Sequence, residues 1–388
     1  MNILKTLTAT LAISASLIAG AYAQTQGVTD SEVIIGSSTD LSGIFAAFGA
    51  PSAKAAQMYF DEVNANGGVH GRQIKFIVED HGYQLPKATQ AMNKLVNRDK
   101  VFATFLQVGT PMNIAGFKLT DAKNIPNIFP LTMARQILQD PFNLHFSPGA
   151  SYYEQIKQGV TYLNNEKGVA NICAMYIPSD FGKEIQEGAN DVAAELGLTF
   201  AAETTHKPDD ADFVGALSKL KEADCGIVAM ALGVRQTITA YATAQKIGFT
   251  EARFISSAAG FHSVMAKVPG GVTEGLYAAA VWSDILPRVK TNATLGAWFM
   301  SYTKATGEQL PGTGAVLGRA GAESLVLALE AAGKDLTVES FIAGMESLSY
   351  YDDILDAQVD FSKEDHAGVD EVIISVIKDT NWQIVSRD

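Results

Sequence analysis

The residue types that could perform catalysis are present in the sequence, but not at catalytic spacings. A serine hydrolase shows Gly-x-Ser-x-Gly at its nucleophile and a P-loop enzyme shows Gly-x4-Gly-Lys-Ser/Thr, and neither pattern occurs. The acidic segment KPDDADF (207–213) is more typical of a loop and helix cap than of a cation site. The histidines are scattered without metal-ligand spacing, at His70, His81, His145, His206, His262 and His366. The sequence therefore favours a binding protein over an enzyme and predicts neither a metal nor a cofactor.

The composition is that of an exported globular protein. The chain has 388 residues, of which 47% are hydrophobic, so it is long enough to form two domains. Its formal net charge of −13 disfavours nucleic acid and anionic lipid as partners. Lys5, the apolar residues 7–19 and Ala21-Tyr22-Ala23 predict a cleavable signal peptide over residues 1–23. We expect the mature chain to begin near Gln24 in the periplasm.

The elements that must position any site alternate between short buried strands and helices. In the first half, strands are expected at 33–37, 74–78, 101–106 and 128–129, with helices at 50–63, 88–96 and 112–122. The pattern restarts after residue 150, with strands at 170–177, 198–204, 225–232 and 253–256. The loop after the first strand, STDLSGIFAAFG, lacks the Gly-x-Gly-x-x-Gly spacing of a dinucleotide site. This succession predicts an α/β protein with parallel sheets covered by helices on both faces.

Two cysteines lie in predicted neighbouring strands of the second half. Cys173 and Cys225 stand in the apolar runs NICAMYI and DCGIVAMAL, where buried free thiols are the favoured interpretation. A disulfide is chemically allowed in an oxidising compartment, and the sequence leaves this alternative open.

Several segments of the chain resemble, in order, the periplasmic proteins that bind branched-chain amino acids for ABC importers. The most specific is NANGGVHGRQIKFIVEDHGY (64–83), in which a helix ends at Gly67-Gly68 and a strand follows. Other segments that resemble the family are SEVIIGSSTDLSG, VGTPMN, NIPNIFP, IPSDFGKEIQEG, ADFVGALSKLKEADCGIVAMAL and VTEGLYAAAVW. The resemblance covers essentially the whole mature chain.

This resemblance implies a type I periplasmic binding fold, with two Rossmann-like lobes joined by a three-segment hinge. Lobe one would comprise residues 24–146 and 279–353, and lobe two 147–278 and 354–388. The crossings would lie near 145–148, 276–280 and 353–359. Such lobes close around a small ligand and deliver it to a permease and ATPase complex. The resemblance also implies a monomer.

The resemblance also implies where the ligand lies. Thr110 resembles the hydroxyl residue that anchors a ligand carboxylate, and Thr132, Met133 and Ala134 resemble its neighbouring contact. Phe48 and Phe181 match aromatic residues of the cleft, one on each lobe. Helix capping by the threonines and core packing by the phenylalanines are the structural alternatives.

The chain departs from the amino-acid binders at the position that pairs with the ligand ammonium. Ala258-Ala259 stand where those relatives have an acidic residue, while Arg319 and Arg235 are expected near the cleft. Ordinary salt bridges are the alternative for both arginines. The sequence thus predicts a carboxylate ligand with an apolar or aromatic body, to which Tyr152 and Trp282 contribute. Branched-chain or other amino acids, amides or urea, and a receptor-linked sensor role remain alternatives.

Overall fold

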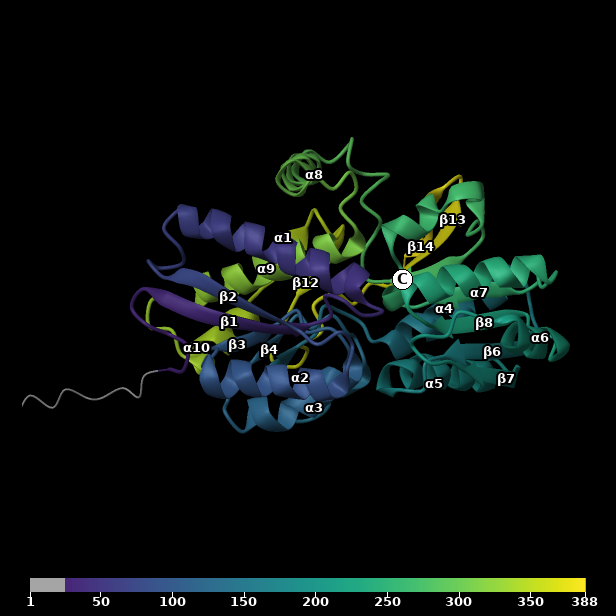
Figure 1. Ribbon diagram of the computed structural model, residues 1–388, viewed down its shortest axis with the longest axis horizontal. Helices are drawn as coiled ribbons and strands as arrows, with labels where there is room; N and C mark the ends of the chain where they lie inside the picture. Colours follow the sequence, from purple (N-terminus) through teal and green to yellow (C-terminus); the bar gives the residue numbers. More distant parts are fainter. Residues whose placement is uncertain (1–24, 388) are drawn as a thin grey trace, which may run out of the picture.

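The chain forms two α/β lobes that lie side by side along the long axis of the molecule (Figure 1). The computed structural model describes residues 25–387. The signal peptide predicted for residues 1–23 therefore lies outside the described residues. No helix within residues 25–387 is both long enough and apolar enough to cross a membrane.

Lobe one is built on a five-stranded parallel sheet with the order β2-β1-β3-β4-β5. Its strands are β1 (Glu32–Thr39), β2 (Gln73–Asp80), β3 (Ala103–Phe105), β4 (Asn127–Ile128) and β5 (His145–Phe146). Its helices are α1 (Ala46–Ala65), α2 (Leu85–Asn93), the π-helix η1 (Lys94–Arg98), α3 (Thr110–Asp121), the 3-10 helix η2 (Arg135–Leu138), α8 (Ala293–Thr306), α9 (Thr313–Ala332) and α10 (Val338–Met345). Helices α1 and α9 lie on one face of the sheet, and α2 and α3 lie on the other (Figure 1).

Close packing of α1 against α9 depends on two glycines of α9. A Cβ atom at Gly314 would lie 2.3 Å from the Phe48 carbonyl oxygen, and one at Gly318 would lie 2.1 Å from that of Ser52. Because any side chain would push the helices apart, these glycines fix where the first turn of α1 lies.

Lobe two is built on a seven-stranded sheet with the order β14-β13-β10-β9-β8-β6-β7. Its strands are β6 (Asn171–Tyr176), β7 (Thr199–Thr205), β8 (Ile227–Ala231), β9 (Arg253–Ser256), β10 (Tyr277–Ala280), β13 (Ile373–Lys378) and β14 (Asn381–Arg387). Its helices are α4 (Tyr152–Glu166), α5 (Asp180–Glu195), α6 (Val214–Glu222), α7 (Val234–Lys246) and the 3-10 helices η3 (Ala258–Gly260), η4 (Ser263–Lys267) and η5 (Pro269–Gly271). Within this sheet β13 runs antiparallel to β10 and β14 antiparallel to β13, and the other described pairs of the sheet are parallel.

The lobe boundaries differ from those proposed from the sequence. Residues 279–280 lie in β10, which pairs with β9 and β13 and so belongs to lobe two. The short ribbon of β11 (Ser349–Asp352) and β12 (Ala357–Asp360) is held to lobe one, where the Tyr350 and Ser324 hydroxyls lie 2.8 Å apart. The second and third crossings therefore follow β10 and β12, a few residues later than the proposed positions.

The two cysteines are joined in the core of lobe two. Cys173 and Cys225 form a disulfide with 5.8 Å between their Cα atoms, and both side chains are buried. The sequence favoured free thiols, and that interpretation is wrong because β6 and β8 are adjacent. The bond closes a loop between residues that are 52 positions apart.

We expect the double variant Cys173→Ala/Cys225→Ala to lose about 2–4 kcal/mol of unfolding free energy, because the unfolded chain is no longer cross-linked. Urea denaturation measured by circular dichroism gives the value. Wild type with reductant should shift in the same direction, and the double variant should not respond to reductant. Equal stability of the oxidised wild type and the variant would contradict the disulfide.

Candidate functional site

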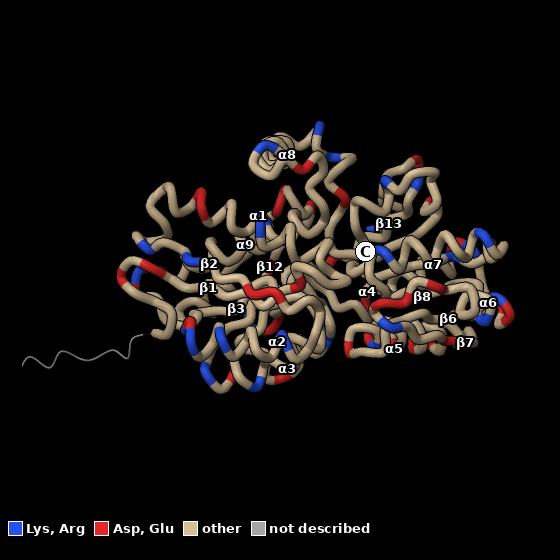
Figure 2. The backbone as a smooth tube through the Cα atoms, in the orientation of Figure 1, with Lys and Arg blue, Asp and Glu red and all other residues tan. Residues whose placement is uncertain are grey.

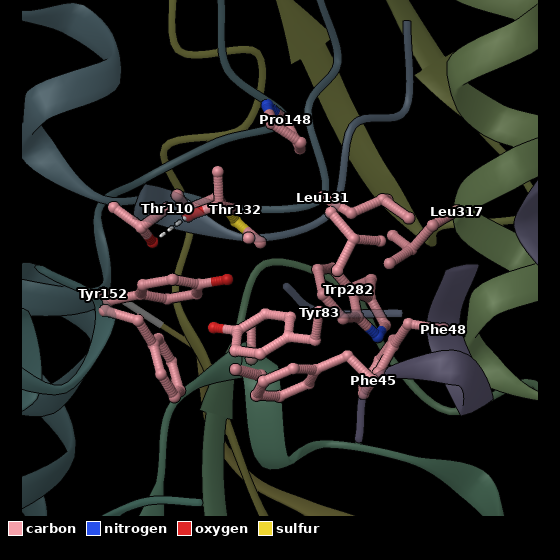
Figure 3. Close-up of a pocket in the computed structure, with 16 residues that line it drawn as sticks. Phe45, Phe48, Tyr83, Thr110, Leu131, Thr132, Pro148, Tyr152, Trp282 and Leu317 are labelled. Carbon is pink, nitrogen blue, oxygen red and sulfur yellow. Dashed lines mark hydrogen bonds between the residues drawn. The ribbon is translucent and has the colours of Figure 1, made fainter. Parts of the chain in front are cut away.

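A pocket lies between the two lobes, with about 500 Å³ of empty space when its opening to solvent is included (Figure 3). Both lobes contribute to its wall, which is rich in aromatic and small apolar side chains. The lining residues are Phe45, Phe48, Tyr83, Val108, Gly109, Thr110, Leu131, Thr132, Met133, Pro148, Tyr152, Phe181, Ala258, Ala259, Trp282 and Leu317.

The topology of the two sheets explains why these residues meet. Parallel strands end at one edge, and the following helices begin there. Four helices accordingly begin at the cavity with Phe45, Thr110, Tyr152 and Phe181 at or beside their first residues. The positive ends of helix dipoles and free N–H groups therefore converge on the cavity.

The start of α3 is one of the helix ends at the cavity that lack a side-chain cap. Gly109 caps it with φ 99°, a conformation that favours glycine, and no side chain caps the helix. Asn113 donates its N–H to the Gly109 carbonyl, which leaves the N–H groups of Thr110 and Met112 without an intrahelical partner, while Pro111 between them has no N–H. This end of α3 can receive an anion.

Three hydroxyl groups gather beside that helix end. The Thr110 and Thr132 hydroxyl oxygens are 2.6 Å apart, as the dashed line in Figure 3 marks. Burial raises the pKa of Tyr152 to about 12, opposed by hydrogen bonds with the Thr132 side chain and the Met133 backbone. Tyr152 is therefore a neutral phenol at physiological pH, and its hydroxyl remains a hydrogen-bond donor.

Aromatic rings from both lobes form the opposite part of the wall. The centroid of Phe45 is 4.7 Å from that of Tyr83 and 5.7 Å from that of Phe181. Phe181 in turn meets Tyr152 edge to face at 5.6 Å. Tyr83 has φ 55° and donates its N–H to His81 Nδ1 at 3.0 Å, which fixes the loop after β2. Such edge-to-face arrangements suit an aromatic or compact apolar guest.

The cavity wall carries no Asp, Glu, Lys or Arg side chain among the described residues. Charged residues of both signs are spread along the helices of both lobes (Figure 2). The buried Asp40 lies close by, but its carboxylate accepts the N–H groups of Gly43 and Phe45 at 2.5 and 2.9 Å. It shapes the loop before α1, and no cavity-lining carboxylate is available to pair with a ligand ammonium.

Most of the residues proposed from the sequence lie on the cavity wall. The structure brings together there Phe48, Thr110, Thr132, Met133, Phe181 and Ala258. Ala134 is buried directly after the lining segment but is not part of the wall. Ala258 donates its N–H to Gln155 Oε1 at 2.8 Å, and this hydrogen bond to α4 holds the Ala258 loop in place.

The two arginines expected at the cleft lie elsewhere. Arg319 is in the second turn of α9 rather than at its start, where it pairs with Glu323 at 2.8 Å and stacks on the Tyr59 ring at 3.8 Å. Arg235 is exposed on the first turn of α7. The helical period explains the error, because the cavity-facing position of α9 is Leu317.

Sequence reasoning missed Phe45, Tyr83, Leu131 and Leu317. Phe45 lies in the loop after β1 and Tyr83 in the loop after β2, and this position was the available signal. The sequence around Leu317 contains no pattern that predicts the passage of α9 along the cavity.

A family model described as "Periplasmic binding protein" matches residues 32–381. The chain belongs to the periplasmic binding protein family. Its members are the solute-binding components of ABC transporters, and its architecture here is the type I fold.

Named relatives of this binding protein are distant. It is 23% identical over 334 residues to "Leu/Ile/Val-binding protein homolog 8" of Brucella abortus, covering 83% of this chain and 81% of that one. A match to the "Amino acid binding protein" of Pseudomonas aeruginosa, 21% identical, spans 51% of this chain and 53% of that protein's length.

Two solved structures share the fold. The fatty acid ABC transporter substrate-binding protein from Thermomonospora curvata superposes with a TM-score of 0.82 at 26% identity, covering 94% of this chain and 93% of that one. A solute-binding protein from R. palustris in complex with benzoate gives 0.78 at 20% identity, covering 92% and 96%. The two proteins are described with different ligands, a fatty acid for one and benzoate for the other.

We expect Arg319→Ala to lower the unfolding free energy by about 0.5–1.5 kcal/mol, because a cation–π contact and an i,i+4 ion pair are lost. Urea denaturation measures the change. Arg235→Ala is the matched control and should change stability by less than about 0.5 kcal/mol. Equal effects of the two substitutions would show that the Tyr59 stack contributes nothing.

Proposed function

We propose that this periplasmic binding protein captures a small carboxylate with an aromatic or compact apolar body and delivers it to an ABC importer. The single observation that carries this proposal is the chemistry of the cavity wall: hydroxyl and helix N-terminal groups at one end, apolar and aromatic side chains elsewhere, and no charged side chain. In this proposal the protein binds its ligand without converting it.

The carboxylate is proposed to lie at the start of α3. The Thr110 and Thr132 hydroxyls and the N–H groups of Thr110 and Met112 supply donors, and the helix dipole favours negative charge there. A hydrogen bond to a charged group is worth about 1.5–3 kcal/mol, so a few such bonds decide which end of the ligand enters.

An α-amino acid fits this cavity poorly. Its ammonium needs a carboxylate or several carbonyl acceptors. Ala258 lines the cavity at the position where the resemblance to amino-acid binders implies an acidic residue. A buried ammonium without a partner costs several kcal/mol. An acid without an amino group avoids this cost, and the rings of Phe45, Phe181 and Trp282 contact its body.

A permease and ATPase complex is the proposed partner of a monomeric binding protein. This follows from the family and from the predicted export of the chain. Branched-chain amino acid binding is the second candidate, which the name of the Brucella relative favours. The two candidates differ in whether the ligand carries an ammonium group.

Isothermal titration calorimetry with benzoate, benzamide and L-leucine tests the proposal. We expect benzoate to bind at least tenfold more tightly than benzamide, because only benzoate carries the charge that the start of α3 favours. We expect L-leucine to bind more weakly still. Micromolar binding of L-leucine together with no binding of benzoate would contradict the proposal and support branched-chain amino acid binding.

Thr110→Ala should weaken benzoate binding by roughly tenfold or more, since one hydrogen bond to a charged group is removed. Thr89→Ala is the matched control, because the Thr89 hydroxyl is exposed on α2 and bonds the Leu85 carbonyl at 3.0 Å. Benzoate affinity unchanged by Thr110→Ala would place the carboxylate elsewhere.

A further inference from the structure

A histidine of lobe two lies where the first helix of lobe one lacks a backbone hydrogen-bond donor. Pro51 lies inside α1 and has no N–H group, so the Ala47 carbonyl lacks its helical i+4 donor. His262 Nε2 lies 3.2 Å from that carbonyl oxygen. The side chain of His262 is 2% exposed, so water does not satisfy these groups instead.

The hydrogen bonds of His262 specify its neutral form. Val264 donates its N–H to His262 Nδ1 at 3.2 Å, so Nδ1 is an acceptor and Nε2 carries the proton given to Ala47. A second proton on Nδ1 would face the Val264 N–H. Burial lowers the pKa of His262 to about 4, and the bond to Ala47 opposes this only in part.

The same imidazole lies against two further groups of lobe one. Its ring meets the Phe48 ring edge to face at 5.1 Å, and Phe48 also lines the ligand cavity. A Cβ atom at Gly312, the residue before α9, would lie 2.9 Å from His262 Cε1. The contact therefore requires a neutral imidazole on one lobe and an unsubstituted glycine on the other.

Charged side chains on the elements packed against His262 have other partners. Asp284 accepts a hydrogen bond from the Ser263 hydroxyl at 2.6 Å, and burial raises the pKa of its carboxyl. The remaining pairs are Lys54 with Glu308, Arg319 with Glu323, Lys267 with Thr380 and Asn381, and Arg387 with Asp356 and Glu371. Desolvation, rather than a neighbouring charge, keeps His262 neutral.

We propose that His262 is a positioning residue for ligand binding, which fastens the Phe48 turn of α1 to lobe two when the lobes close and releases it on protonation. The inference rests on the proposed closure of the lobes around a ligand. Acidification would then open the lobes and weaken ligand binding independently of the ligand's own chemistry.

The direction and size of the pH effect on lobe closure follow from the difference in the pKa of His262 between the open and closed states. Opening exposes the imidazole and returns its pKa towards about 6.5, so protons bind preferentially to the open state. Closure is fully favoured above this value and is lost as pH falls from about 6.5 to about 4. Between pH 8 and pH 5 the benzoate affinity should fall by roughly ten- to thirtyfold.

Other titratable groups define the controls. His81 bonds the Val108 carbonyl and the Tyr83 N–H within lobe one, and Glu184 of lobe two pairs with Arg135 of lobe one. The difference between wild type and His262→Gln removes their contributions. His206→Gln is the matched control, because His206 is a buried histidine that bonds Thr204 inside lobe two.

Calorimetry with benzoate at pH 8 and pH 5 is the test. His262→Gln keeps a donor for Ala47 but does not titrate, so its affinity should change less than threefold over this range while His206→Gln behaves as wild type. Gly312→Ala should weaken binding at both pH values by roughly five- to a hundredfold, because its Cβ would lie 2.9 Å from His262 Cε1 and so oppose the contact between the lobes. An equal pH dependence of wild type and His262→Gln, or wild-type affinity of Gly312→Ala, overturns the proposal.

A ligand-free measurement separates this inference from the proposed function. If benzoate does not bind, the ligand assignment fails, and small-angle scattering of the ligand-free proteins still tests His262. Wild type should be more compact at pH 8 than at pH 5, and His262→Gln should be equally compact at both. A wild-type radius that does not change with pH overturns the role of His262.

Discussion

The constraint on which this structure depends is the direction of its parallel strands. All parallel strands of a sheet end at one edge, so the loops and helix beginnings that follow them must gather there. Each lobe turns that edge towards the other, and the cavity forms where the two edges face (Figure 1). The start of α3 and the turn before α5 therefore meet although they belong to different sheets.

The absence of charge on the described cavity wall distinguishes this site chemically. In the proposed complex, a ligand carboxylate would be held by dipoles and hydroxyl protons rather than by a counter-ion. Such groups cost little desolvation when the lobes close, because neither Thr110 nor Thr132 carries a net charge. Because the same wall offers no carboxylate, burying an ammonium group there would cost free energy, and the proposed selection against amino acids rests on Ala258 as much as on any attractive contact.

The sequence predicts the parallel α/β architecture and the family well, because strands such as β1 and β2 are short apolar runs with clear turns around them. Residues in the segments that follow strands were also predictable, since Thr110 after β3 and Thr132 after β4 line the cavity as expected. The direction of a side chain on a long helix was not readable. Whether Arg319 or Leu317 faces the cavity depends on how α9 packs on α1, which Gly314 and Gly318 set at long range.

A crystal structure of the protein with benzoate tests the central claim most directly. The account predicts both lobes closed on the ligand, with its carboxylate oxygens within hydrogen-bond reach of the Thr110 hydroxyl and the first N–H groups of α3. The ring would then lie among Phe45, Phe181 and Trp282. A carboxylate directed towards Trp282, or paired with an arginine that has moved into the cavity, would contradict the account.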